Sequence, residues 1–186
     1  MRLFPSFRKD PNEAPARALY RAAVEQARQP VFFVECEVPD TLDGRFETIA
    51  LHVFLLLRRL GSEDGRKAEA QGLAQALFDT MFLDMDENLR EIGVGDLSVG
   101  KKVKEMARAL YGRIAAYEDG LAGDDAQLED AVRRNLYGTV EPGGAAVRAV
   151  AVYLRRAEAA ITAQPLAALL AGEARFGSPP GPVVQR

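Results

Sequence analysis

Cysteine, histidine and tryptophan are scarce in this sequence of 186 residues, which holds one cysteine, one histidine and no tryptophan. The single cysteine, Cys36, allows no intrachain disulfide, and this cysteine usage is typical of a reducing compartment. Structural zinc sites need several Cys or His ligands, and di-iron bundles need Glu-x-x-His on two helices. One cysteine and one histidine supply neither set, so we expect no metal centre and no cofactor.

Long apolar runs are also lacking. The longest one, residues 49–57, contains His52 and is followed by two arginines, whereas a membrane-spanning helix needs about 20 apolar residues. The first ten residues, MRLFPSFRKD, do not have the apolar segment of a secretory signal. We therefore expect a cytoplasmic protein whose contact with the inner membrane is at most peripheral.

An excess of positive charge is missing as well. The net charge is −3 and the isoelectric point is about 5.4, which argues against a specific nucleic-acid binder because such proteins carry a basic domain or stripe. The charge is unevenly spread: residues 63–91 hold eight acids and three bases, and residues 98–118 hold five bases and two acids. Neighbouring helices of opposite sign should attract, which favours an antiparallel hairpin.

Apolar residues recur at helical spacing through most of the chain. We predict an all-α, single-domain bundle of six to eight helices over residues 12–172, with a flexible segment at 1–11 and a disordered tail at 173–186. The helix over 46–60 is apolar on nearly every side, so we place it at the centre of the bundle.

Three local patterns carry further predictions. Asn12 can cap a first helix that ends near Arg28. Residues 31–38 alternate like a strand, but no second strand is evident, so we interpret them as an extended connector on the core. Gly112 interrupts a later helix, where glycine costs about 1 kcal/mol relative to alanine; close packing against a neighbour would explain it.

The stretch from Asp79 to Lys104, DTMFLDMDENLREIGVGDLSVGKKVK, joins the acidic region to the basic one through a glycine-rich turn. It places Lys101, Lys102 and Lys104 at the expected start of a helix, where the dipole disfavours each positive charge by about 0.3–1 kcal/mol. Two explanations remain open. The lysines pair with acids across the turn, or they form a docking surface for a partner.

Several resemblances to catalytic or ligand-binding motifs fail. Residues 95–102 resemble a phosphate-binding loop, but Lys102 replaces the magnesium-binding hydroxyl and a helix precedes the segment. Asp84 and Asp86 resemble the start of a calcium loop but lie in an apolar-periodic helix. His52 is either a haem ligand, a catalytic base, or a core histidine that makes one hydrogen bond. We expect no enzyme.

Three long segments resemble the ubiquinol–cytochrome c chaperone family, whose members assist assembly of the cytochrome bc complex of respiratory chains. They are VPDTLDGRFETIALHVFLLLRRL at 38–60, LAQALFDTMFLDMDENLREIGVGDLSVGKKVKEM at 73–106 and ALYGRIAAYEDGL at 109–121. The resemblance covers about residues 17–140, and the Ala- and Arg-rich sequence is similar to the alphaproteobacterial members. It implies an all-helical, non-catalytic chaperone that binds newly made cytochrome b, with the ribosome or a second assembly factor as further partners.

The resemblance implies a binding surface rather than a catalytic site. The candidate partner-binding residues at matching positions are charged: Asp40, Asp43, Arg45, Asp79, Asp84, Asp86, Arg90, Asp96, Lys101, Lys104 and Arg113. An apolar client also calls for an exposed apolar groove. We place that groove at the Met81–Met85 face, because methionine adapts to varied partners.

Two functions of other classes remain as alternatives. A haem or quinone carrier would have an apolar cavity of at least ~300 Å³ beside His52. A ribosome-associated factor would use the Lys101–Lys104 patch on RNA, and its binding would weaken steeply with salt.

Overall fold

The computed structural model describes residues 10–62 and 66–181, and within these ranges it contains helices and no strand. The helices are α1 (Glu13–Ala27), α2 (Val31–Val34), α3 (Leu42–Gly61), α4 (Lys67–Glu91), α5 (Asp96–Ala122), α6 (Asp125–Leu136), α7 (Gly144–Thr162) and α8 (Leu166–Leu170). The all-α, single-domain prediction is confirmed, and so is the predicted helix number.

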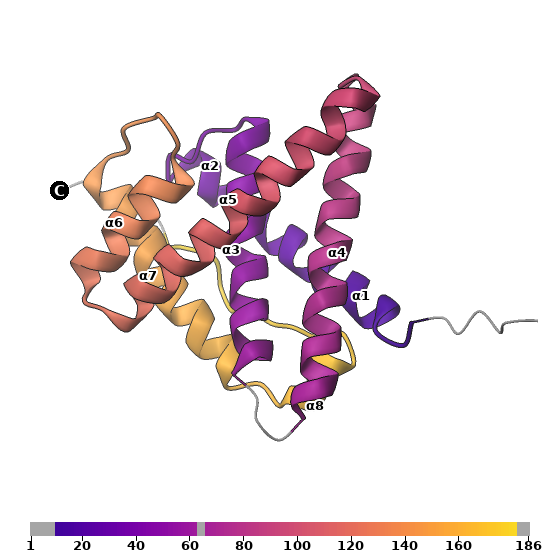
Figure 1. Ribbon diagram of the computed structural model, residues 1–186. Helices are drawn as coiled ribbons and strands as arrows, with labels where there is room; N and C mark the ends of the chain where they lie inside the picture. The colour runs from indigo at the N-terminus through magenta and orange to yellow at the C-terminus, as the bar shows by residue number, and fades with distance from the viewer. Residues whose placement is uncertain (1–9, 63–65, 182–186) are drawn as a thin grey trace, which may run out of the picture.

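Helix α3 is the centre of the bundle, as predicted. The Thr41 side chain caps its start by accepting a hydrogen bond from the Gly44 N–H at 3.1 Å. Asp43 in the first turn and Arg58 in the last turn interact favourably with the helix dipole. Residues of α3 are buried from the first turn almost to the last, and the helix contacts α1, α4, α5, α6 and α7. Figure 1 shows these helices arranged around it.

His52 lies inside this core and has no exposed surface. Its Nδ1 lies 2.7 Å from the Thr48 carbonyl oxygen, which can only accept, so Nδ1 carries the proton and Nε2 accepts from the Tyr153 hydroxyl at 2.7 Å. Burial lowers the pKa of His52 to about 4. The sequence predicted one hydrogen bond at the core margin; the structure shows two, at full burial, because Tyr153 of α7 reaches the far side of the ring.

The turn between α4 and α5 is shorter than predicted. Helix α5 begins at Asp96 behind the N-cap Gly95, so Gly100 and all three lysines lie inside the helix. The dipole effect fades within the first turn, and the lysines are therefore not placed against it. The two helices meet at a tip and then diverge, with α5 crossing α3 toward α6 (Figure 1). The predicted hairpin is an open one.

The connector at residues 31–38 begins as a short helix, so its prediction as extended was wrong. The Val34 N–H donates to the Pro30 carbonyl at 2.9 Å, and the Glu35 N–H donates to the Val31 carbonyl at 3.1 Å. Pro30 favours this start because its ring fixes φ near the helical value and because proline has no backbone N–H that would need a hydrogen-bond partner. Phe32 of α2 is buried against His52 and Tyr153.

The glycine that permits close helix packing is Gly120 rather than Gly112. A Cβ atom added at Gly112 would meet nothing within 4 Å, whereas one at Gly120 would lie 3.0 Å from Leu128 Cδ1 and 3.3 Å from Ala131 Cβ. Both neighbours belong to α6. The close approach therefore lies in the last turn of α5, where α6 folds back.

The prediction of a disordered tail from residue 173 is wrong for residues 173–181. Phe176 is buried against His52. Side chains of α1, of α7 and of the α7–α8 linker hold the backbone: Gln164 bonds to both the N–H and the carbonyl of Arg175, Gln26 bonds to the carbonyl of Gly177, and Arg156 bonds to the carbonyls of Ser178 and Pro179. One buried aromatic ring and these side-chain hydrogen bonds hold the segment in place, although it contains few apolar residues. Residues 182–186, and residues 1–9 of the predicted flexible segment, lie outside the described residues.

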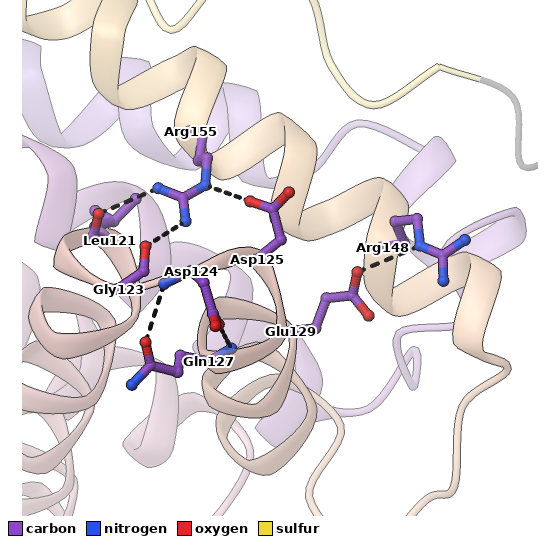
Figure 2. Close-up of polar contacts among 8 residues, drawn as sticks. All are labelled: Leu121, Gly123, Asp124, Asp125, Gln127, Glu129, Arg148 and Arg155. Atoms are coloured by element: carbon purple, nitrogen blue, oxygen red, sulfur yellow. Dashed lines mark hydrogen bonds and ion pairs between the residues drawn. The ribbon is translucent and has the colours of Figure 1, made fainter.

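Arg155 of α7 joins three helices at one point (Figure 2). Its guanidinium donates to the carbonyls of Leu121 at 3.1 Å and Gly123 at 2.9 Å, and its Nε donates to the Asp125 carboxylate at 3.0 Å. The first two acceptors are carbonyls at the C-terminal end of α5, which have no partner within their own helix. Beside them, Asp124 and Gln127 form a capping box that starts α6.

Candidate partner-binding surfaces

The eleven candidate residues fall into two groups and two single positions. Asp40, Asp43, Arg45 and Arg113 lie in or beside a groove at the start of α3. Asp86, Arg90, Asp96, Lys101 and Lys104 lie around the α4–α5 tip. Asp79 and Asp84 lie further down α4. The sequence thus names residues of two surfaces rather than of one.

The groove has a volume of about 580 Å³ and lies between the start of α3, the middle of α5 and the segment after α6. We call it the α3–α5 groove. Its lining combines apolar side chains with a few charges: Pro39, Thr41, Asp43, Gly44, Phe46, Glu47, Glu105, Met106, Ala109, Arg113, Leu136, Tyr137, Gly138, Thr139 and Val140.

A tight loop shapes one edge of this groove. A Cβ atom at Gly44 would lie 2.0 Å from the Pro39 carbonyl oxygen, so a residue with a side chain there would force the loop apart. Arg45 Nε donates to Asp40 Oδ1 at 2.7 Å, and this bond, with the arginine charge, lowers the pKa of Asp40. Both side chains are open to solvent, so the pair orients the loop end rather than stabilising the fold.

A buried ion pair forms the inner wall of the groove. Arg113 of α5 donates from Nε and Nη2 to the two carboxylate oxygens of Glu47 on α3. Burial raises the pKa of Glu47, while the Arg113 hydrogen bonds and charge oppose that rise. Arg113 also lies over the ring of Phe46, 5.7 Å from its centroid. The geometry keeps Arg113 occupied inside the protein, so its charge is not free for a partner.

The tip carries a different arrangement. Arg90 pairs with Asp86 at 2.6 Å and also with Asp96 across the turn. Lys101 approaches only Glu105, at 3.9 Å on the same helix, and Lys104 pairs with no acid among the described residues. Cross-turn pairing with the α4 acids therefore does not account for the lysines. Ile92, at the end of α4, is 61% exposed.

Asp84 and Asp79 have local partners. Asp84 accepts a hydrogen bond from the Tyr20 hydroxyl of α1 at 2.7 Å, and burial together with this bond raises the pKa of Tyr20. Asp79 accepts from Gln75 on its own helix at 2.8 Å. Asp84 thus ties α1 to α4, which is a structural role that a sequence pattern alone cannot separate from partner binding.

The predicted methionine groove is wrong. Met81 is fully buried and Met85 is 6% exposed, because both face the core from α4. The exposed residue of this stretch is Leu83, which lies on the opposite side of the helix. A groove with an apolar lining lies instead beside α3 and contains Met106.

The structure offers little to a ligand carrier built on His52. Both ring nitrogens already have partners, and His52 lines neither the α3–α5 groove nor the pocket beside Tyr20 and Asp84. Across residues 10–62 and 66–181, no group of three or more His, Cys, Asp and Glu side chains is placed to hold a metal ion. No helix in the same ranges is long and apolar enough to cross a membrane.

Sequence reasoning missed Glu47 and the residues after α6 that complete the groove. Glu47 did leave a signal, because an acid within a helix that is apolar on nearly every side must be buried with a partner. Tyr137 and Val140 left none, since their place depends on how α6 folds back onto α5. The fold brings them to the groove from a segment more than ninety residues after α3 begins.

In its described part the protein is all-helical and has an apolar groove with exposed acids at its edge, an arrangement found in proteins that bind other polypeptides. Comparison with known proteins places it more closely. The model of the ubiquinol–cytochrome c chaperone family matches residues 34–176. The chain belongs to that family, as the sequence resemblance indicated.

Named relatives agree with this placement. The chain is 28% identical over 121 residues to ubiquinol–cytochrome-c reductase complex assembly factor 1 of Xenopus laevis, covering 65% of this chain and 59% of that protein. It is 31% identical over 112 residues to the mitochondrial protein CBP3 of Saccharomyces cerevisiae, covering 58% of this chain and 32% of the yeast protein. The chain thus matches only part of these longer relatives.

A solved structure matches almost the whole chain. The crystal structure of the Cbp3 homolog from Brucella abortus has a TM-score of 0.79 and 35% sequence identity, covering 90% of this chain and 91% of that one.

Proposed function

We propose that this protein is a non-enzymatic chaperone for assembly of the cytochrome bc complex and that it binds newly made cytochrome b on the cytoplasmic face of the membrane. The observation that carries the proposal is the family match over residues 34–176, supported by relatives named as assembly factors of ubiquinol–cytochrome c reductase. Client binding, rather than catalysis, is what the two charged surfaces are suited to.

The two surfaces have different parts in this proposal. The α3–α5 groove offers a concave apolar lining to the client, with Asp43 at its edge. The tip offers Lys104 and the exposed Ile92 to a second partner, for which a further assembly factor and the ribosome are the candidates. Asp40, Arg45 and Arg113 shape the groove, and Asp84 holds α1 against α4.

The test is a deletion in the source organism, followed by reduced-minus-oxidised difference spectra of its membranes. We expect selective loss of the b and c haem signals of the bc complex while terminal oxidases stay intact. A normal bc complex in the deletion strain would overturn the proposal. In that case the purified protein would be titrated with haem and quinones.

Complementation then connects the phenotype to the surfaces. Wild-type protein should restore the haem signals, as should Glu69→Gln, which changes an exposed acid in the first turn of α4. Asp43→Asn combined with Glu105→Gln should restore them only in part. All variants would be compared at equal protein level on immunoblots, so that low abundance is not mistaken for lost binding.

A further inference from the structure

We infer that the α3–α5 groove binds a short polypeptide segment in which apolar side chains are followed directly by lysine or arginine. The identity of the protein that supplies the segment rests on the proposed function. The chemistry of the segment comes from the groove itself.

The lining of the groove fits apolar side chains. Phe46 and Leu136 form its almost fully buried floor, the partly exposed Met106 lines its wall, and Val140 stands at the edge with 48% of its surface exposed. The volume of about 580 Å³ lies within the range of about 300–1,000 Å³ that binding sites commonly have. Such a lining gains from burying apolar side chains, and Met106 can adapt its shape to them.

The charges at the groove favour a cation. Arg113 is held by Glu47, so this buried pair contributes no free charge. Asp43 makes no ion pair among the described residues, and Glu105 has only the distant, exposed Lys101. The groove therefore has two carboxylates at its edge and no free cation in its lining. This arrangement attracts lysine or arginine and repels phosphate, which excludes RNA and anionic lipid headgroups as its occupants.

Apolar residues followed by basic ones occur together at a definite place in membrane proteins. The cytoplasmic loops next to membrane-spanning helices carry an excess of lysine and arginine. The junction between such a helix and its loop thus has the composition that the groove selects. A chaperone that holds this junction would contact a membrane-protein client without entering the bilayer.

The direct test is fluorescence anisotropy of the purified full chain with a fluorescein-labelled peptide, Gly-Ser-Leu-Leu-Arg-Lys-Gly-Ser. We expect saturable binding that weakens with salt, because exposed charges are screened. A peptide with glutamates in place of the arginine and lysine, and another with serines in place of the leucines, should each bind at least about tenfold more weakly. Equal binding of the acidic peptide, or no binding of the first one, would overturn the inference.

Variants locate the binding to the groove. Asp43→Asn should weaken binding of the basic peptide about threefold, and adding Glu105→Gln should bring the loss to about tenfold, as expected for exposed charge pairs. Val140→Ser should weaken binding of the same peptide through its apolar part. Glu69→Gln, the matched first-turn control, should bind like the wild type. A loss with Glu69→Gln as large as that with Asp43→Asn would contradict the assigned site.

The peptide assay tests the chemistry of the groove and the deletion strain tests the assembly role, so either proposal can be overturned without the other. Peptide binding that follows the charge rules, in a protein whose deletion leaves the bc complex normal, would keep the groove chemistry and remove the proposed client. Loss of the bc complex on deletion, with no peptide binding, would keep the assembly role and remove the groove as its site.

Discussion

At the scale of single residues, His52 links the fold to pH. The folded protein holds the ring neutral because burial lowers its pKa to about 4, while the unfolded chain binds a proton near pH 6.5. The stability that this pKa difference contributes is present above pH 6.5 and is lost as the pH falls toward 4. The shift corresponds to about 3 kcal/mol.

Comparison of the wild type with His52→Gln, which has no titrating group at this position, isolates the contribution of His52 to the pH dependence of stability. The wild type should be the more stable at neutral pH, and its advantage should shrink by about 3 kcal/mol between pH 6.5 and 4. Urea unfolding at several pH values measures both free energies, and the difference removes the contribution of the other acids. Parallel pH curves for the two proteins would show that His52 is not held neutral.

Arg113 gives a second prediction at this scale, because Glu47 is buried beneath it. Arg113→Ala should cost about 3–5 kcal/mol of unfolding free energy at neutral pH, since it leaves a buried carboxylate without a partner. The raised pKa of folded Glu47 means that its contribution is favourable below the unfolded pKa and is lost as pH rises through the folded one. Without Arg113 the pKa rises further, so the deficit should grow with pH.

Denaturant unfolding between about pH 5 and 8 measures this trend. Glu47→Gln added to Arg113→Ala serves as the matched control, because it removes the buried charge while keeping the size of the side chain. The double variant should recover part of the stability and lose the pH trend. A deficit that stays constant with pH in the single variant would contradict burial of a charged Glu47.

At the scale of elements, the arrangement of α5, α6 and α7 depends on Arg155. Arg155→Ala removes two bonds to carbonyls at the end of α5 and one to Asp125 (Figure 2), and bonds to charged groups contribute about 1.5–3 kcal/mol. Because the side chain is partly exposed, we expect a loss of about 2 kcal/mol in thermal or chemical unfolding. Arg148→Ala, which removes one exposed contact to Glu129, should cost less than about 1 kcal/mol. Similar losses for both variants would show that the helix-end carbonyls contribute little.

Helix positions could be predicted from the sequence where apolar periodicity was strong, as in α3, whose central place was also correct. The errors lie where local residues conflict with distant contacts. The glycines before Lys101 suggested a longer turn, but an exposed glycine such as Gly100 is tolerated inside α5. The tail was predicted to be disordered because its composition is poor in apolar residues, yet Phe176 reaches the core and Gln164 holds the backbone beside it.

At the scale of the whole molecule, only half of the candidate groove could be predicted. Asp40 and Asp43 stand out as acids at a helix start, and Arg113 stands out on α5. Their common location requires the crossing of α3 and α5, which no spacing in the sequence reveals. The buried methionines of α4 make the same point, since a face of a helix is exposed or buried only once its neighbours are known.

We expect the α3–α5 groove and the α4–α5 tip to act as separate surfaces. Lys101→Glu combined with Lys104→Glu reverses the charge of the tip at exposed positions, where substitutions usually change stability by less than about 0.5 kcal/mol. Neither lysine pairs with Asp43, and the one contact with a groove carboxylate, from Lys101 to Glu105, is long at 3.9 Å and exposed on both sides, so it contributes little. Sites that are coupled this weakly have nearly additive energetic effects. The tip variant should therefore bind the basic peptide within about twofold of the wild type and yet restore the bc complex only weakly in the deletion strain.

Anisotropy and difference spectra measured on the same variant decide between the outcomes. Full restoration of the haem signals would show that the tip docks no partner needed for assembly, and the lysines would then serve only as a solvated helix face. A large change of peptide affinity would show instead that the tip and the groove act as one surface, with Lys101 controlling the free charge of Glu105. Lys102→Glu, on a neighbouring side of α5, is the control for charge reversal itself, because it reverses one exposed lysine of the same helix while leaving Lys101 and Lys104 in place.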